Sequence, residues 1–426
     1  MSAATTPRAA ALPEPPHLAD PKLTYVAQDT WGAWQEHVQH GFHEAVNPDW
    51  ADLGRRLFPR AGCFGMRVGD EWVSTASSTD RMLGIPGDGE LRCAAVSDVT
   101  VSPSYRRRGL LRTMMRHQLE TVAGQGAPMA ALWASESSIY GRFGYGVAAW
   151  SAELGGQTAR SSFVPEVPTS GSTVEVDSDQ WLAAAKPVWE VVRAQQPGMF
   201  DRAGDWWDLE TWDPEKDRAG FAARRYVVHY DGGGQVDGVG SFAVKPHWST
   251  SGPDGEVKIG PVLAITPSAY AGLWRHQLDV DLAQSFSSPS AAVDEPLLHL
   301  LADPRALQTR PVDGLYLRIL DVHTALAARA YSTDADVVLQ LSDPILADLA
   351  GRYRVRIADG RAEVSRTDDA PDLSMGACEL ASCYLGGTSF VDLQRAGRVT
   401  EHSPGAVRTA SAAFKWDRAP HCPDHF

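Results

Sequence analysis

The segment VSPSYRRRGLL, residues 101–111, combines residue types that suit the binding of an anionic ligand. The apolar residues that follow, among them Leu111, Met115 and Leu119, recur at helical spacing, so a helix begins directly after the arginines. The first N–H groups of a helix lack partners within the helix and carry partial positive charge, which attracts phosphate. Gly109 lets the backbone approach such a ligand closely. The segment therefore predicts a phosphate-binding loop.

Two other phosphate-binding loops do not fit this segment. A Walker loop ends in Gly-Lys-Ser/Thr, and a dinucleotide-binding loop has three glycines, whereas this turn has one. An arginine triplet alone is more often a solvated basic patch, but this one ends in glycine, lies between a predicted strand and a helix, and stands out in an acidic chain. The arginines can donate charge-assisted hydrogen bonds to phosphates, and the edge of the preceding strand can pair with a pantetheine arm. The predicted ligand is coenzyme A, bound by Val99, Thr100, Val101, Arg107, Arg108, Gly109 and Arg112.

A second segment, SESSIYGRFGYG at residues 135–146, follows the next predicted strand, AALWAS. In an α/β unit this order places Ser135, Glu136 and Tyr140 at the carboxyl end of that strand, beside the predicted thioester. Acyl transfer from a thioester releases a thiolate whose conjugate acid has a pKa of about 8.5, and a tyrosine hydroxyl can protonate it. We therefore predict that Tyr140 is the general acid and that Tyr145 packs the turn. The residues alone leave the base unassigned.

The composition limits the classes to which the chain can belong. Its 426 residues are enough for two or three domains, and a formal charge of −14 argues against a nucleic-acid partner. No apolar run is long enough to cross a bilayer, and residues 1–22 are rich in Ala and Pro without a hydrophobic signal core. The five cysteines are scattered and form no CxxC pair, so we expect buried thiols and no metal site. We predict a cytoplasmic protein with a flexible N-terminal leader.

The order of the predicted elements indicates successive α/β segments. Strand, loop, helix and strand between residues 93 and 135 form a βαβ unit with parallel strands, and the loop opens at the carboxyl end of the first strand. The Pro- and Ser-rich residues 161–172 mark a domain boundary. The glycine-rich residues 231–240 lie between two extended runs, so they predict a hairpin turn rather than a ligand loop.

A second copy of the first α/β unit is predicted further along the chain. Residues 261–286 repeat the order of strand, Pro-Ser turn and helix, with Tyr270 in the place of Tyr105. The arginines and the glycine at the helix entrance are missing, as in a duplicate that has lost the loop chemistry. From GLYLRILDV, residues 314–322, strands alternate with helices, which predicts a third, α+β domain.

Together, VSPSYRRRGLL and SESSIYGRFGYG resemble the motifs of the Eis (enhanced intracellular survival) family of GNAT acetyltransferases. The resemblance covers almost the whole chain, including its length, the degenerate second unit, the GLYLRILDV segment and the end PHCPDHF. It implies an α/β and α+β fold of two tandem GNAT folds, the second without a cofactor loop, followed by a domain similar to sterol carrier proteins. After the leader, these domains would span residues 23–160, 161–310 and 311–426.

The resemblance also implies roles for individual residues. Tyr140 matches the family's general acid, and the terminal carboxylate, here that of Phe426, reaches back into the first domain as the base. An α-carboxyl group has an unperturbed pKa of about 3.3–3.7, so it is a weak base unless burial raises this value, and it can also orient the amine. His425 stands where some relatives have an acidic residue. The implied contacts of acetyl-CoA are Val99, Thr100, Val101, Arg107, Arg108, Gly109, Leu110, Leu111, Arg112, Ser135 and Glu136.

Three hypotheses for the function follow. The resemblance implies an N-acetyltransferase that acetylates amine-bearing small molecules, such as aminoglycoside antibiotics, sometimes at several positions, and that assembles as homohexamers built as trimers of dimers. The acidic chain suits such polycationic substrates. The second hypothesis is a lysine acetyltransferase that modifies proteins or peptides with the same machinery. The third is a non-catalytic acyl-CoA- or lipid-binding protein that uses the third domain as a carrier pocket, against which the intact Tyr140 motif counts.

Overall fold

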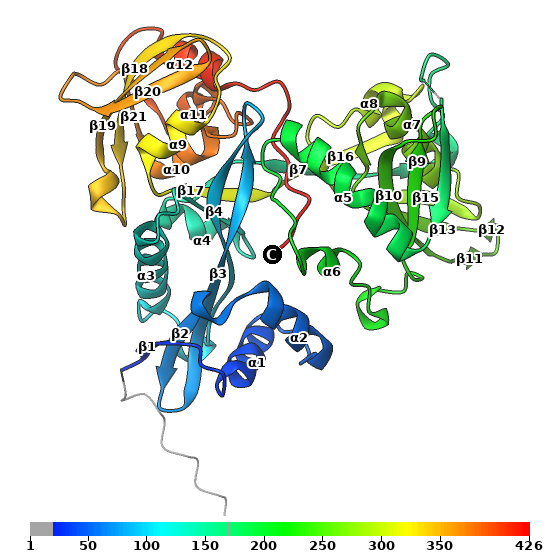
Figure 1. The fold of residues 1–426 in the computed structure, drawn as a ribbon, viewed down its shortest axis with the longest axis horizontal. Helices are drawn as coiled ribbons and strands as arrows, with labels where there is room; N and C mark the ends of the chain where they lie inside the picture. The colour runs from blue at the N-terminus through cyan, green and yellow to red at the C-terminus, as the bar shows by residue number, and fades with distance from the viewer. Residues whose placement is uncertain (1–19, 169) are drawn as a thin grey trace, which may run out of the picture.

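The protein consists of three domains arranged around its own C-terminus. The structure, a computed structural model, describes residues 20–168 and 170–426, so most of the predicted leader lies outside the described residues. Figure 1 shows the first domain in blue and cyan, the central domain in green and the third in orange, with the C-terminus between the first two. Among the described helices, none combines the length and apolar character needed to cross a membrane.

The first domain is built on a seven-stranded sheet of order β1-β2-β3-β4-β5-β17-β6. Helix α3 carries its buried residues on one face, as its apolar spacing predicts, and it packs against the sheet between β4 and β5. The elements are β1 (Lys22–Tyr25), α1 (Trp31–Gly41), α2 (Pro48–Leu57), β2 (Cys63–Val68), β3 (Glu71–Ile85), β4 (Gly89–Val101), α3 (Leu110–Gly124), β5 (Met129–Trp133), α4 (Ser137–Tyr140), β6 (Gly146–Val147) and β17 (Leu315–Ile319).

Strands β4 and β5 are parallel, which confirms the predicted βαβ unit. Their pairing runs from Cys93 opposite Met129 to Val96 opposite Leu132 and then stops. Beyond this point β4 stays paired with β3 as far as Val101, but its other edge is free of β5. The two strands therefore separate at their carboxyl ends, which is where an α/β sheet binds ligands.

The central domain has an eight-stranded sheet of order β16-β7-β15-β13-β10-β9-β8, with β14 also paired to β10. Helix α7 and the β9–β10 hairpin confirm the predictions, but the strand expected directly before the Pro-Ser turn is only the two-residue β14, antiparallel to β10. The parallel strands that flank α7 are β13, which ends before this segment, and β15. The elements are β7 (Trp150–Gln157), β8 (Ser172–Val176), α5 (Ser178–Gln195), α6 (Trp206–Glu210), β9 (Arg225–Tyr230), β10 (Val236–Lys245), β11 (Trp248–Ser249), β12 (Gly252–Pro253), β13 (Gly255–Ile259), β14 (Leu263–Ala264), α7 (Pro267–Leu278), β15 (Ala283–Ala292), α8 (Leu297–Leu300) and β16 (Leu307–Asp313).

The first two domains exchange strands, which the order of elements along the chain did not predict. Strand β7, expected in the first domain, lies in the central sheet between β15 and β16. Strand β17, from the GLYLRILDV segment expected to open the third domain, lies instead in the first sheet between β5 and β6. All five residues of β17 are buried, so both of its faces need cover, and a central place in the first sheet provides it.

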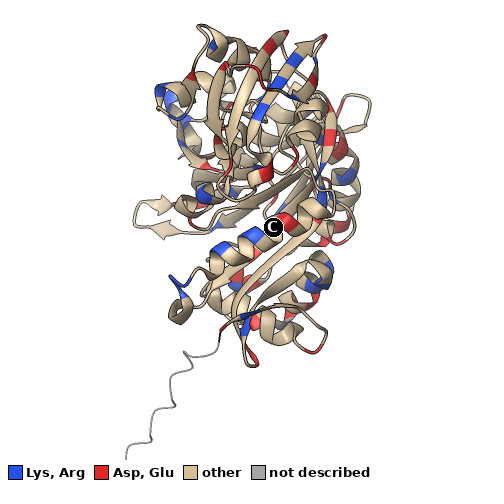
Figure 2. Ribbon diagram, turned by 90° about the vertical axis from the view of Figure 1, so that its left-hand side faces the viewer, with Lys and Arg blue, Asp and Glu red and all other residues tan. Residues whose placement is uncertain are grey.

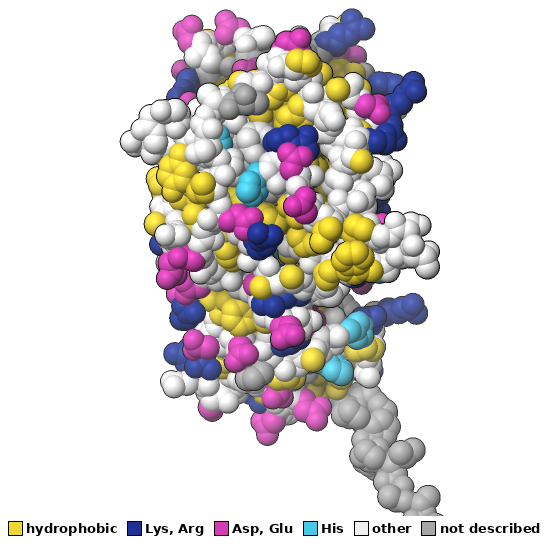
Figure 3. Space-filling view, turned by 90° about the vertical axis from the view of Figure 1, so that its right-hand side faces the viewer, with side chains coloured by type: hydrophobic (Ala, Val, Ile, Leu, Met, Phe, Trp, Pro, Cys, Tyr) yellow, Lys and Arg dark blue, Asp and Glu magenta, His cyan; other side chains and the backbone are white. Residues whose placement is uncertain are grey.

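The third domain confirms the predicted α+β pattern. Its five-stranded sheet has the order β20-β19-β18-β21-β22, and four short helices accompany it. Acidic and basic residues alternate along the ribbon in Figure 2, and their side chains are interspersed over the face seen in Figure 3. The elements are α9 (Val322–Ala328), β18 (Ala335–Ser342), β19 (Gly351–Ala358), β20 (Arg361–Arg366), β21 (Leu373–Gly376), α10 (Ala377–Cys383), α11 (Phe390–Arg395), β22 (Thr400–Glu401) and α12 (Ala406–Phe414).

The C-terminal tail runs from the third domain into the space between the other two, where a buried ionic cluster holds it. The Asp424 carboxylate is 2.7 Å from Nη2 of Arg202 and 3.2 Å from Nη2 of Arg81. All three side chains are buried, and Arg202 also contacts Glu210 at 2.8 Å. The guanidinium of Arg202 lies 3.5 Å from the centre of the Trp189 ring. Burial lowers the pKa of Arg202, but Asp424 and Glu210 outweigh this effect and raise it overall.

We predict that Asp424→Ala lowers the free energy of unfolding by about 3–5 kcal/mol, because it removes the buried carboxylate that two buried guanidinium groups share. Asp417→Ala is the matched control, since Asp417 lies in the same tail and is exposed. Urea unfolding of both variants measures the difference. A loss of under about 1 kcal/mol for Asp424→Ala would show that the cluster does not hold the tail.

Candidate active site

A cavity of about 720 Å³ lies where β4 and β5 separate, between the start of α3 and the turn after β5. Eleven of the thirteen residues predicted for the site, all except Arg108 and Phe426, line this cavity. The structure therefore brings together two segments that lie about thirty residues apart in the sequence. The full lining is Gly41, Phe42, His43, Val99, Thr100, Val101, Tyr105, Arg106, Arg107, Gly109, Leu110, Leu111, Arg112, Ser135, Glu136, Ile139, Tyr140, Arg142, Phe143 and Ile345.

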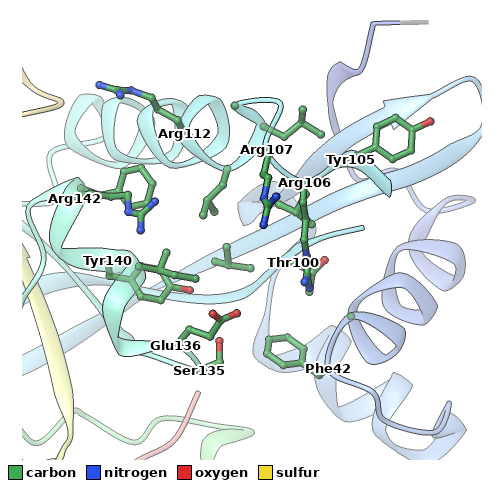
Figure 4. Close-up of a pocket in the computed structure, with 18 of the residues that line it drawn as sticks. Phe42, Thr100, Tyr105, Arg106, Arg107, Arg112, Ser135, Glu136, Tyr140 and Arg142 are labelled. Atoms are coloured by element: carbon green, nitrogen blue, oxygen red, sulfur yellow. The ribbon is translucent and has the colours of Figure 1, made fainter. Parts of the chain in front are cut away.

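The start of α3 forms one wall of the cavity and has the features of an anion site. Gly109 precedes the helix with φ of +84°, and no side chain within the described residues caps the first N–H groups. Arg107 has φ of +64°, an unfavourable value for a residue with a side chain. In Figure 4 the side chains of Arg106 and Arg107 point towards β4, whereas that of Arg112 points away. Free N–H groups, the helix dipole and guanidinium groups together can bind a pyrophosphate.

Arg108 does not lie in the cavity, where the sequence predicted it. Its guanidinium lies 5.0 Å from the centre of the Tyr105 ring and does not line the cavity. Tyr105 is buried, so Arg108 covers the turn from outside. Arg106, which the sequence analysis did not single out, lines the cavity instead. Three adjacent arginines at a tight turn cannot all face one side, and only the backbone geometry selects which of them do.

The free edge of β4 forms the floor of the cavity. Val99, Thr100 and Val101 line it and have no partner strand on the β5 side. The hydroxyls of Thr75 and Thr100 are 2.6 Å apart, and the Thr75 hydroxyl also donates to the carbonyl of Asp98 at 2.7 Å. These bonds fix the edge of β4, whose amides and carbonyls are free to pair with an amide-bearing arm.

Tyr140 ends the short helix α4, directly after the carboxyl end of β5. Its side chain is buried, and its hydroxyl points to the side of the cavity where Ser135 and Glu136 lie (Figure 4). Burial, and secondarily the charge of Glu136, raises the pKa of Tyr140 to about 12. Tyr140 is therefore protonated throughout the neutral range and able to donate a proton. Tyr145 is fully buried, and its ring centre is 6.0 Å from that of Tyr140, as expected of a packing residue.

The turn that carries Tyr140 rests on a buried ion pair between domains. Arg318 of β17 contacts Asp343, which follows β18, at 2.5 Å, and both side chains are buried. Gly144 has φ of +84°, and a Cβ atom at this position would lie 2.8 Å from the guanidinium carbon of Arg318. The GRFGYG segment therefore needs glycine at residue 144 for two reasons, its backbone conformation and the close approach of Arg318.

The last two residues of the tail approach the same end of the first sheet without lining the cavity. The His425 ring stacks on Trp133, the last residue of β5, with centroids 4.2 Å apart. The Phe426 ring packs against Phe200, with centroids 5.2 Å apart. The tail therefore ends beside Trp133, two residues before Ser135 of the cavity lining.

Sequence reasoning missed several residues of the site. Phe42 and His43, which follow α1, line the cavity across from the α3 start, and Ile345 enters it from the third domain. Arg81 and Arg202, which hold the tail, were also missed. None of these residues belongs to a motif, so no local signal could have identified them.

Comparisons with known proteins agree with this architecture. Family models match residues 22–148 and 198–319 as acetyltransferase (GNAT) domains and residues 322–423 as a sterol carrier protein domain. An uncharacterized N-acetyltransferase of Streptomyces coelicolor is 37% identical over 407 residues, covering 94% of this chain and 98% of the relative. The N-acetyltransferase Eis of Mycobacterium tuberculosis is 33% identical over 407 residues, covering 92% and 96%. The crystal structure of Eis1 from Mycobacterium abscessus matches with a TM-score of 0.82 at 30% identity, covering 95% of this chain and 100% of Eis1.

Two GNAT folds in tandem, a sterol carrier protein domain and a cavity at the free edge of β4 define an N-acetyltransferase that uses a CoA-type acyl donor. The chain belongs to the Eis family of GNAT N-acetyltransferases. Its acceptors are therefore amines.

We predict that Arg107→Gln weakens the binding of acetyl-CoA about tenfold or more, because it removes a charged donor that points into the cavity. Arg108→Gln is the matched control, since Arg108 lies on the Tyr105 ring outside the cavity. Isothermal titration calorimetry with acetyl-CoA compares the two variants. Equal losses of affinity would contradict the distinction between these neighbouring arginines.

Proposed function

We propose that the protein acetylates amino groups of polycationic small molecules, such as aminoglycosides, with acetyl-CoA as the donor. The cavity is the observation that carries this proposal, because it combines an anion-binding helix start with a protonated tyrosine on the facing wall. The acidic chain favours cationic acceptors. Location in the cytoplasm and assembly as homohexamers stay predictions.

The proposed mechanism assigns each wall of the cavity a task. The N–H groups of α3, with Arg106 and Arg107, bind the phosphates of acetyl-CoA, whose thioester supplies the acetyl group. The edge of β4 orients the pantetheine arm, and the hydroxyl of Tyr140 donates a proton to the departing sulfur. The terminal carboxylate of Phe426 accepts the proton of the amine or holds its ammonium form. An α-carboxylate is a weak base unless burial raises its pKa.

Thiol release from acetyl-CoA with kanamycin as the acceptor tests this function. We expect turnover by the native chain and a loss of turnover when a short extension follows Phe426, because the extension removes the terminal carboxylate from its place. Equal turnover in both chains would support the transferase function but show that a group other than the terminal carboxylate is the base. Faster acetylation of a peptide lysine than of kanamycin in competition would favour the protein-modifying alternative. Absence of thiol release with every amine tried would contradict the proposal.

We predict that Tyr140→Phe lowers kcat about 100-fold, because the variant has no hydroxyl to protonate the sulfur. The affinity for acetyl-CoA is expected to stay unchanged, since the ring still fills its buried place. Tyr145→Phe is the control, because Tyr145 lies in the same turn and packs away from the cavity lining. Steady-state kinetics and calorimetry separate the two effects, and an unaltered kcat in Tyr140→Phe would remove this residue as the acid.

A further inference from the structure

Asp98 occupies a strained position in the strand that forms the floor of the cavity. It has φ of +56°, which is uncommon for any residue other than glycine, although Asp tolerates it better than most. The pairing of β3 with β4 shifts register next to it, between Thr75 and Ser77. Such a bulge redirects a side chain out of the regular alternation of a strand. Local strain of this kind persists where the surrounding structure fixes it, and it is frequent at functional sites.

Asp98 lies on β4 directly before the residues that form the cavity floor, on the edge of the cavity rather than in its lining. It lies two residues beyond Val96, the last residue of β4 that pairs with β5, and directly before Val99 on the cavity floor. On the β5 side, the residue after Leu132 is Trp133, which the ring of His425 covers. Asp98 and Trp133 therefore both lie just beyond the last paired residues of the two strands, and the tail covers Trp133.

Asp98 is one of the residues that line a small void of about 20 Å³ among aromatic residues. A void of this size holds about one water molecule, and an ammonium group is of similar size. Trp31, Trp34 and Trp50 line the same void. Tryptophan rings attract cations, and a carboxylate beside them completes a site for an organic ammonium group. Phe426 packs against the same aromatic cluster, so the terminal residue borders this region as well.

The surroundings of Asp98 give its carboxylate the character of a base. Burial raises its pKa to about 6, although a hydrogen bond from the hydroxyl of Ser77, at 2.6 Å, opposes this rise. The charge of Glu44, after α1, adds to it. From β2, the thiol of Cys63 also faces Asp98, and burial keeps this thiol protonated by raising its pKa. A carboxylate with these properties accepts a proton near neutral pH more readily than an unperturbed α-carboxylate does.

We propose that Asp98 is a second carboxylate of the acceptor site, which binds the ammonium group of the substrate and takes its proton as the amine attacks. This inference rests on the proposed function and assigns the binding of the amine and the acceptance of its proton to two different carboxylates. The terminal carboxylate of Phe426 holds and orients the amine, and Asp98 accepts the proton.

The protons and electrons of the proposed step balance. Asp98 takes one proton from the ammonium group and later releases it to solvent. The lone pair on nitrogen then forms a bond to the thioester carbon, and the bond from this carbon to sulfur breaks. Tyr140 protonates the departing sulfur, and the second proton of the nitrogen restores the Tyr140 hydroxyl. The products are the acetylated amine, free coenzyme A and one proton in solution.

The test compares the native chain with Asp98→Asn, which keeps the size of the side chain and an acceptor for Ser77. Asp80→Asn is the control, because Asp80 is exposed and pairs with Arg92 on the outer part of the β3–β4 hairpin. Three quantities are measured: the pH dependence of kcat/KM with kanamycin, calorimetric binding of kanamycin without acetyl-CoA, and the melting temperature. We expect the native kcat/KM to fall below about pH 6 as Asp98 becomes protonated.

For Asp98→Asn we expect kcat to fall about 100-fold and kanamycin to bind more weakly, with no loss of melting temperature at pH 7.5, because no buried charge remains to be desolvated. Ser77→Ala removes the hydrogen bond that lowers the pKa of Asp98, so it should move the acid limb to higher pH. An unchanged kcat and pH profile in Asp98→Asn would overturn the inference and leave the transferase function intact. Absence of turnover by the native chain with every amine would contradict the proposed function. In that case kanamycin binding still tests the inference about Asp98, and equal binding by the native chain and Asp98→Asn would overturn it.

Discussion

The carboxylate of Asp424 joins parts of the chain that are far apart in sequence. It lies between Arg81 on β3 of the first domain and Arg202, which precedes α6. Taking three charges out of water is costly, and the cluster is favourable only when all partners are in place. Its geometry therefore permits essentially one path for the last residues, which brings His425 onto Trp133 and Phe426 onto Phe200. The contribution of the tail to the site depends on this cluster.

The cavity also depends on the third domain, which the exchanged strand β17 joins to the first. Because β17 inserts between β5 and β6, the chain that enters the third domain first completes the sheet behind the Tyr140 turn. Arg318 of this strand packs over Gly144 and reaches Asp343 of the third domain. The third domain thus supports the turn that carries Tyr140 and adds Ile345 to the cavity lining. A truncation that removed this domain would expose the sheet and remove that support.

The two GNAT folds of this chain share an architecture, but only the first has the features of a phosphate-binding loop. Both have a helix flanked by parallel strands, but α3 begins after Gly109 with uncapped N–H groups, whereas α7 begins after Thr266, whose hydroxyl accepts a hydrogen bond from the N–H of Ala269 at 3.1 Å. A Thr cap satisfies a donor that a phosphate would otherwise bind, and no arginine stands at this helix start. A few residues at the start of one helix therefore account for the difference between a ligand loop and a structural copy.

The sequence by itself determined the local units of this protein. Helical spacing after Arg108 predicted α3, alternation predicted β4, and the residues around Gly109 and Tyr140 predicted the cavity walls, because backbone periodicity and turn chemistry depend on near neighbours. Tertiary structure alone decided which arginines face the cavity and where β7 and β17 pair. It also placed Asp98 beside the aromatic void and Asp424 between two arginines. Such contacts form between residues distant in sequence, and pairing over that distance leaves no periodic signal in the chain.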